Sequence, residues 1–151
     1  NDVGPNPGDN FGASMTVGDF NGDGVEDIAV GATGVTINGS SQAGAVYVFN
    51  GTLEWTTIDI FSQALSGFHT DPEEGDQFGS SLAAGDFNND GFDDLVVGSP
   101  YEDLGGNNQL VDAGMVTVLY GSSSGLSDPS VLHQYSLQGF VVVKLFFHRL
   151  S

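Results

Sequence analysis

GDFNGDGVED, residues 18–27, is followed 67 residues later by GDFNNDGFDD, residues 85–94. Each copy places four carboxylates and at least one side-chain amide within ten positions. Carboxylates at this spacing repel one another unless a cation lies between them, because each carries a full negative charge. The pattern therefore indicates a duplicated unit with a bound cation in each copy.

The duplication extends outward from these two stretches. Residues 8–32 align without a gap onto residues 75–99, and residues 43–52 align onto residues 113–122. Each unit contains four short segments rich in apolar residues and separated by turn residues, which favours four strands per unit. Four strands in a unit of this size are typical of a propeller blade. The predicted strands are Ser14–Phe20, Ile28–Thr33, Ala45–Asn50 and Thr57–Leu65 in the first unit, and Ser81–Phe87, Leu95–Ser99, Met115–Tyr120 and Val131–Leu137 in the second.

The apolar patterning predicts that the two units stack. Central segments such as DIAVGA and MVTVLY are almost continuously apolar, which indicates strands covered on both faces. We therefore expect an all-β chain of two four-stranded antiparallel blades of a β-propeller, forming a partial ring or a ring completed by other copies. Blade 1 is predicted at 1–68 and blade 2 at 69–140. Aromatic residues at matching places in the two units are expected to pack between blades: Phe11, Phe20, Phe78 and Phe87.

Composition excludes several classes of function. Twenty acidic residues against two basic residues give a net charge of −18, so the chain lacks the clustered Lys and Arg that nucleic-acid binding requires. No apolar run approaches the ~20 residues of a membrane-spanning helix. There is no cysteine, hence no disulfide framework. GSSSG, residues 121–125, fits a nucleophile motif, but no helical pattern follows it. We therefore expect no enzymatic activity.

The two acidic loops carry oxygen at alternating positions, as a calcium loop does. Side-chain oxygens at loop positions 1, 3, 5 and 9, together with a main-chain carbonyl at position 7, would give a hard cation the 6–8 oxygens that calcium takes. Magnesium fits less well, because it prefers a tight octahedron with retained water. The sequence thus predicts two Ca²⁺ sites, whose ligands are Asp19, Asn21, Asp23, Val25 and Asp27 in loop 19–27, and Asp86, Asn88, Asp90, Phe92 and Asp94 in loop 86–94.

These loops differ from an EF-hand, which places a bidentate Glu at position 12 between two helices. Position 12 here is Val30 or Val97, within a predicted strand. Simple acidic turns are the alternative, but turn preferences alone do not explain the same four ligand positions twice. The extra carboxylates at Glu26 and Asp93 are expected to add local negative charge without binding the ion directly.

The motifs around these loops resemble the FG-GAP repeats of integrin α-subunit β-propellers and their prokaryotic relatives. NFG and GAT, at 10–12 and 31–33, flank the first loop, and QFG and GSP, at 77–79 and 98–100, flank the second. The resemblance implies that each unit is one blade and that calcium stiffens the hairpin between its first two strands. It also implies about seven blades in a complete ring, of which this chain carries two.

The sequence therefore predicts a calcium-binding, integrin-like β-propeller module for interaction or adhesion outside the cell or at its surface. Its ligand would be a protein or a glycan, and further blades or self-association would close the propeller. The alternatives are a non-catalytic appendage domain of a secreted hydrolase and a purely structural adhesin repeat. Residues 141–151 contain both basic residues of the chain and no acid, and we interpret them as a tail outside the repeat.

Overall fold

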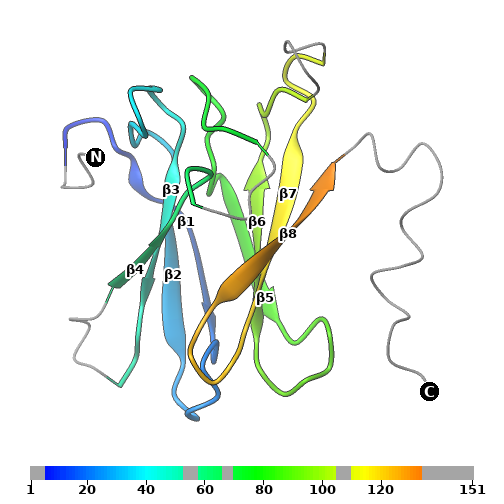
Figure 1. Ribbon diagram of the computed structural model, residues 1–151. Coiled ribbons are helices and arrows are strands. Elements are labelled where there is room, and N and C mark those ends of the chain that lie inside the picture. The colour runs from blue at the N-terminus through cyan, green and yellow to red at the C-terminus, as the bar shows by residue number, and fades with distance from the viewer. Residues whose placement is uncertain (1–5, 53–57, 66–69, 105–109, 134–151) are drawn as a thin grey trace.

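The computed structural model describes residues 6–52, 58–65, 70–104 and 110–133 (Figure 1). The predicted boundary between the units at residues 68 and 69, the predicted tail at 141–151 and the end of the last predicted strand lie outside these residues.

The described chain is all-β, as predicted, and forms two antiparallel sheets of four strands each, with no helix in the described ranges. Neighbouring strands in the chain are neighbours in the sheet, so each sheet is a simple meander, in the order β1-β2-β3-β4 and β5-β6-β7-β8. This is the topology of a propeller blade. The strands are β1 Phe11–Gly18, β2 Asp27–Ala32, β3 Ala45–Phe49, β4 Ile58–Phe61, β5 Ser81–Gly85, β6 Asp94–Ser99, β7 Met115–Tyr120 and β8 Ser127–His133.

Several strand ends differ from the prediction. β1 begins at Phe11 instead of Ser14, because the register shift between these two residues lets Phe11 pair with Ala32. β8 begins at Ser127 instead of Val131, because a second register shift, after Val118, allows pairing to begin next to the hairpin turn. β4 ends at Phe61 instead of Leu65, since the chain turns there with a hydrogen bond from Leu65 N to the Ser62 carbonyl.

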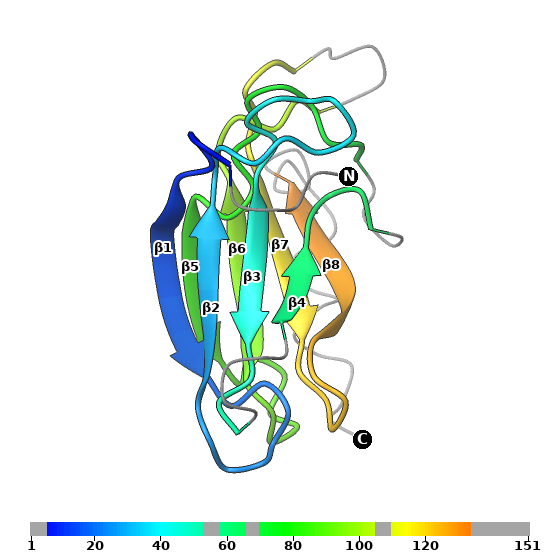
Figure 2. The same cartoon turned by 90° about the vertical axis from the view of Figure 1, so that its left-hand side faces the viewer.

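The two sheets pack face to face, with β1 beside β5 (Figure 2). Each blade contributes one apolar face to a shared core, as the continuous apolar patterning predicted. A smaller apolar cluster packs the loop between β2 and β3 of blade 1, through Val35 and Ile37, against the ends of these two strands at Ala32 and Ala45. The shared core consists of Phe20, Ala29, Val46, Val48, Phe78, Leu95, Val97 and Leu119.

The face of blade 2 that packs on blade 1 is equivalent, in the repeat, to the outer face of blade 1, which packs on no other blade in the described chain. Leu82 and Val97 are cross-strand partners on blade 2 and pack on the shared core. Their equivalents on blade 1, Met15 and Val30, are also cross-strand partners; Val30 is buried, but the Met15 side chain is 69% exposed. The stack therefore ends on an apolar face of the kind that it buries in its middle.

The FG pair of blade 2 fits into blade 1. Phe78 is fully buried, and its main-chain N–H donates to the Ala43 carbonyl at 2.8 Å. The following Gly79 carbonyl accepts a hydrogen bond from Ser14 Oγ at 2.6 Å. A Cβ atom on Gly31 would overlap the Gly79 carbonyl oxygen, so the close approach of the two blades requires glycine at residue 31.

Two of the four aromatic residues expected between the blades are not buried. Phe20 and Phe78 are buried at the interface, as predicted. Phe11 and Phe87, at the equivalent positions of the other unit, are 57% and 45% exposed. The reason is position in the stack: Phe11 would face a blade preceding blade 1, and Phe87 would face a blade following blade 2.

Candidate metal centre

Both acidic loops lie at the same end of the molecule, where β1 joins β2 and β5 joins β6 (Figure 1). Each loop turns sharply at the glycine after position 5. Gly24 and Gly91 adopt φ angles of 86° and 93°, a conformation that residues with side chains rarely take. The turn predicted from the Asp-Gly pairs is therefore present in both copies.

The side-chain oxygens of the first loop fold inward onto its own main chain. Asp19 Oδ1 and Asn21 Oδ1 both accept a hydrogen bond from Asp23 N, at 3.1 and 2.9 Å. Asp19 Oδ2 accepts from Gly24 N at 2.9 Å, and Asp23 Oδ1 accepts from Val25 N at 2.9 Å. The side-chain oxygens at positions 1 and 3 thus accept from the same N–H group, and the carboxylate at position 5 accepts from the N–H group two residues later in the same turn.

The second loop repeats this arrangement. Asp86 Oδ1 and Asn88 Oδ1 both accept from Asp90 N, at 3.1 and 2.9 Å, and Asp86 Oδ2 accepts from Gly91 N at 3.0 Å. Asp90 Oδ1 accepts from Phe92 N at 3.0 Å. The four corresponding distances in the two loops agree to within 0.1 Å. Two stretches that differ in sequence therefore adopt one loop conformation.

The carboxylates at position 9 lie beneath the loops and are buried. Asp27 Oδ1 accepts from Gly51 N at 2.9 Å, and Asp94 Oδ1 accepts from Gly121 N at 3.0 Å. Burial raises the pKa of both carboxyl groups; these hydrogen bonds lower it again, and the other carboxylates of the same loop raise it further. Each position-9 carboxylate thus ties its loop to the strand end after β3 or β7, in addition to any role toward a cation.

The donor set fits a hard cation by its chemistry, because every predicted side-chain ligand offers oxygen. No three His, Cys, Asp or Glu side chains in the described ranges are gathered closely enough to hold a metal ion. In this conformation the loop N–H groups hold the carboxylates of positions 1 and 5, while position 9 is held from below. Ion binding would therefore require these side chains to turn toward one another.

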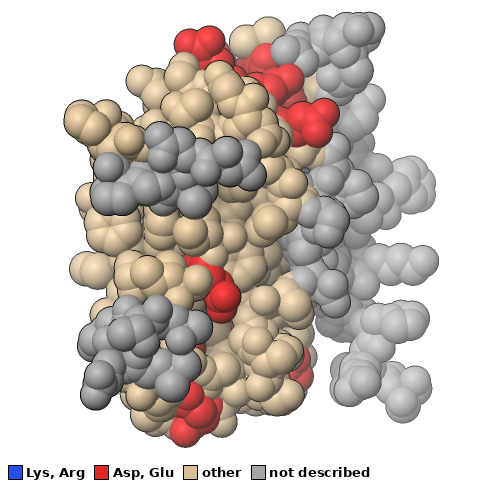
Figure 3. Space-filling model, turned by 60° about the vertical axis from the view of Figure 1, so that its left-hand side comes forward, with Lys and Arg blue, Asp and Glu red and all other residues tan. Residues whose placement is uncertain are grey.

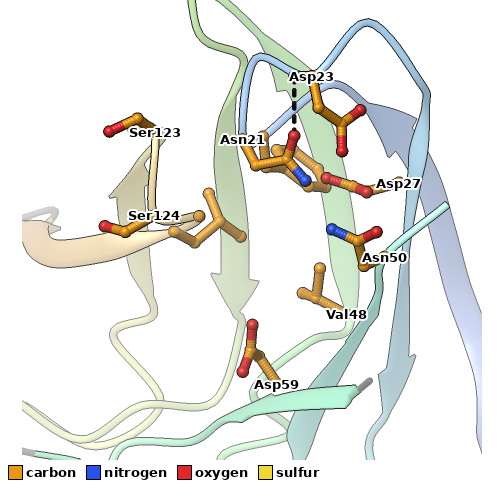
Figure 4. A pocket seen from close by; sticks show the side chains of 11 residues that line it. Asn21, Asp23, Asp27, Val48, Asn50, Asp59, Ser123 and Ser124 are labelled. Atoms are coloured by element: carbon orange, nitrogen blue, oxygen red, sulfur yellow. Dashed lines mark hydrogen bonds between the residues drawn. The ribbon is translucent and has the colours of Figure 1, made fainter. Parts of the chain in front are cut away.

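A cavity of about 360 Å³ opens between the first loop and the β7–β8 hairpin of blade 2 (Figure 4). Asn21, Asp23 and Asp27 line it from the loop side, and Ser123 and Ser124 line it from the hairpin. The cavity therefore combines carboxylate, amide and hydroxyl groups from both blades.

Asn50 and Thr52 lie near Asp23 at this cavity and were not predicted from sequence as site residues. Asn50 lies on its wall, and Thr52 Oγ1 donates to Asn50 Oδ1 at 2.7 Å and lies 3.4 Å from Asp23 Oδ2. The alignment of residues 43–52 with 113–122 pairs Thr52 with Ser122 but Asn50 with Tyr120, so the repeat gives a signal for Thr52 alone.

The extra carboxylate at Asp93 also makes a hydrogen bond to the other loop, which the sequence did not predict. Its Oδ2 accepts a hydrogen bond from Asp19 N at 3.0 Å, so it reaches from the second loop to position 1 of the first. Glu26, at the equivalent position of the first loop, is exposed. The two extra carboxylates therefore have different roles, because only Asp93 lies at the interface between the blades.

Acidic side chains on the face shown in Figure 3 lie at the top, near the centre and in the lower part of the described surface, and none of the described side chains there is Lys or Arg. No Lys or Arg occurs among the described residues, so no described Lys or Arg side chain lies beside the acidic loops. No helix within the described ranges is long and apolar enough to cross a membrane.

Comparison with known proteins identifies the repeat. The FG-GAP repeat family profile matches residues 11–49 and 78–119. The phosphatidylinositol-glycan-specific phospholipase D of Mus musculus is 40% identical over 127 residues, covering 80% of this chain and 14% of that protein. Integrin alpha-PS5 of Drosophila melanogaster is 39% identical over 123 residues, covering 80% and 11%. Integrin alpha-3 of Cricetulus griseus is 37% identical over 117 residues, covering 77% and 10%. The chain thus spans a small part of each relative.

Proposed function

The chain belongs to the FG-GAP repeat family, and on that premise we propose that it is a calcium-binding pair of propeller blades that serves protein or glycan interaction outside the cell or at its surface. The observation that carries the proposal is the pair of loops, which share one conformation and present oxygen at the same positions. No catalytic role is proposed for it.

Calcium is the ion that the proposal assigns to both loops. The proposed ligands are the ten residues predicted from sequence, with Asn21 and Asn88 supplying amide oxygen beside the carboxylates. Bound calcium would offset the mutual repulsion of carboxylates that the described chain leaves without Lys or Arg partners. Extracellular calcium modules bind in the ~10⁻⁴ to 10⁻³ M range, which agrees with a location outside the cell.

Further blades complete the module. FG-GAP blades need additional blades to close a propeller, and both ends of this two-blade stack carry faces of the kind buried in its middle. We propose that these faces bind blades of the same type, from other copies of this chain or from a longer polypeptide. The ligand-binding surface would then form on the assembled ring.

A second candidate function is an appendage domain of a secreted hydrolase. It is favoured by the match to phosphatidylinositol-glycan-specific phospholipase D, which is as similar to this chain as the integrin α-subunits are. The repeat would have the same fold and calcium loops in either context. A catalytic domain encoded in the same gene would favour the appendage, and further FG-GAP repeats with a surface anchor would favour adhesion.

Calorimetric titration with CaCl₂ tests the metal assignment. We expect two bound ions in the unmodified chain and one in each of Asp23→Ala and Asp90→Ala, because each substitution removes a central carboxylate from one loop. Asp59→Ala is the matched control, since it removes an exposed carboxylate that lines the cavity but lies outside both loops. Two ions retained at unchanged affinity in Asp23→Ala or Asp90→Ala would show that the ligand assignment is wrong.

A further inference from the structure

We propose that Asp93 is a positioning residue for the first calcium site, although it belongs to the second loop. The inference rests on the calcium binding proposed above and assigns to Asp93 a role across the blade interface. Asp93 would hold the main chain at Asp19, the first ligand position of the other loop, and would thereby couple the two sites.

Two hydrogen bonds join Asp93 to Asp19. Asp93 Oδ2 accepts from Asp19 N at 3.0 Å, and Asp93 N donates to the Asp19 carbonyl at 3.1 Å. Because each residue donates one of these hydrogen bonds and accepts the other, the two bonds fix Asp93 and Asp19 relative to each other across the blade interface. The absence of a side chain at Gly18 leaves room for this approach, because a Cβ there would lie 3.1 Å from Asp93 Oδ2.

A side-chain contact reinforces the same connection. The ring of Phe92 lies against Gly22, where a Cβ atom would be 2.6 Å from the nearest ring carbon. Gly22 stands between positions 3 and 5 of the first loop, and Phe92 is position 7 of the second. Adjacent residues of the second loop therefore contact the first loop at its start and at its turn.

The duplicated sequence supplies an internal comparison. Glu26 is the equivalent of Asp93 in the first loop, and its exposed side chain makes no hydrogen bond to another described residue. Asp86 is the equivalent of Asp19, and it has no neighbouring loop to hold it, because the described chain has no third blade. The bridge is therefore a property of the interface between the blades and not of each loop alone.

The bridge should affect calcium affinity by keeping the first loop in its folded conformation. An Asp19 main chain that is already fixed loses less conformational freedom when the loop binds an ion. Ordering of residues 92–94 by an ion in the second loop would also fix the carboxylate that holds Asp19. Binding at the two sites should accordingly be positively coupled.

The test uses calcium affinity in chains that retain a single site. Asp90→Ala leaves only the first site, and each further substitution is made in that background and titrated with CaCl₂ in a calorimeter. Asp93→Ala removes the bridge and one charge, whereas Asp93→Asn removes the charge but keeps an oxygen that can accept from Asp19 N. Glu26→Ala removes the same charge from the first loop itself and makes no change to the bridge.

We expect Asp93→Ala to weaken the first site about 5- to 10-fold beyond Glu26→Ala, within the usual range of coupling between sites. Asp93→Asn should bind like Glu26→Ala. In the complementary Asp23→Ala background, Asp93→Ala and Glu26→Ala should leave the second site within about 2-fold of each other. Equal calcium affinities of Asp93→Ala and Glu26→Ala at the first site would overturn the positioning role. The proposal that the unmodified chain has two calcium sites would not be affected by that result. Failure of the unmodified chain to bind calcium would instead overturn the proposed function, and the positioning role with it.

Discussion

Glu102 occupies in blade 2 the buried position that Val35 occupies in blade 1. The Val35 carbonyl accepts from Gly44 N at 3.1 Å, and the Glu102 carbonyl accepts from the equivalent Gly114 N at 3.0 Å. Both side chains are buried, with exposed fractions of 2% and 0%. Gln63, from the end of blade 1, donates to the Glu102 carboxylate. One blade thus places an ionisable group where the other places an aliphatic one.

This carboxyl group should make stability depend on pH. Burial, and then the nearby Asp76 carboxylate, raise the pKa of Glu102 from 4.5 to about 7. Between these two values the folded chain keeps a proton that the unfolded chain releases, so its free energy of unfolding falls as the pH rises. The stabilising contribution is fully present below about pH 4.5 and is lost by about pH 7, a change of about 3 kcal/mol.

Glu102→Val, which installs the residue of blade 1, isolates this contribution. Urea unfolding at several pH values between 5 and 8.5, in chelator, should give a shallower decline with pH for the variant than for the unmodified chain. Asp27 and Asp94 also have raised pKa values, but they titrate in both proteins and cancel in the difference. Asp76 does not cancel, because its charge interacts with Glu102 and its own raised pKa should fall when Glu102 is replaced. Parallel curves would contradict the assignment of the buried proton to Glu102.

Calcium should raise thermal stability. A ligand present at ~100 times its dissociation constant adds about 2.7 kcal/mol per site, provided that it binds only the folded chain. Two sites should therefore move the melting temperature upward by several degrees relative to a sample in chelator. Circular dichroism melting curves in CaCl₂ and in chelator measure this shift, with MgCl₂ as a control for non-specific charge screening. Coincident curves in CaCl₂ and chelator would argue against binding to the folded state.

The two equivalent FG aromatics should differ in their contribution to stability. Phe78→Ala empties a fully buried site between the blades and should cost about 3–5 kcal/mol. Phe11→Ala removes a ring that is 57% exposed and contacts Tyr47 and Phe49 edge-on, so it should cost about 1 kcal/mol. Denaturant unfolding of both variants tests the difference. Similar losses for the two would mean that Phe11 is buried in solution.

Two equivalent glycines should also respond differently to alanine. A Cβ on Gly31 would overlap the Gly79 main-chain carbonyl, so Gly31→Ala should destabilise the chain by about 1–3 kcal/mol. A Cβ on Gly98 would overlap only Ser81 Oγ, which rotation of the serine side chain relieves. Gly98→Ala should therefore leave the unfolding free energy of the isolated chain nearly unchanged. A large loss of unfolding free energy for Gly98→Ala would show that the outer face of blade 2 is already covered.

Self-association of the chain should depend on the two outer faces of the stack, one on blade 1 around Met15 and one on blade 2 around Gly98. Phe11, Met15 and Val17 on β1 are 57%, 69% and 53% exposed, and exposed apolar groups of this kind mark interaction surfaces, so we expect the chain to associate at micromolar concentration. Gly98→Ala should weaken this association, since it fills the position at which a following blade would approach. Light scattering on both proteins measures the mass. A stable monomer of the unmodified chain would refute the proposed stacking.

The repeat and its approximate strands could be predicted from the sequence alone. Both acidic loops, the meander of four strands per unit and the all-β class follow from local patterns, because alternating loop oxygens, turn glycines and apolar runs act over a few neighbouring residues. Strand ends were predicted less accurately: β1 and β8 begin several residues earlier than expected, because register shifts depend on the paired strand.

Only the tertiary structure decided which residue of each equivalent pair is buried or makes a contact between the blades. Phe11 and Phe78 look alike in sequence, yet only Phe78 is buried, because blade 1 covers it. Asp93 holds Asp19 across the interface, whereas the equivalent Glu26 has no loop beside it. The burial of Glu102 next to Gln63 and Asp76 was likewise not predicted. A duplicated sequence specifies the same local structure twice, but contacts between the copies are not duplicated, since each blade meets its neighbour through only one of its two faces.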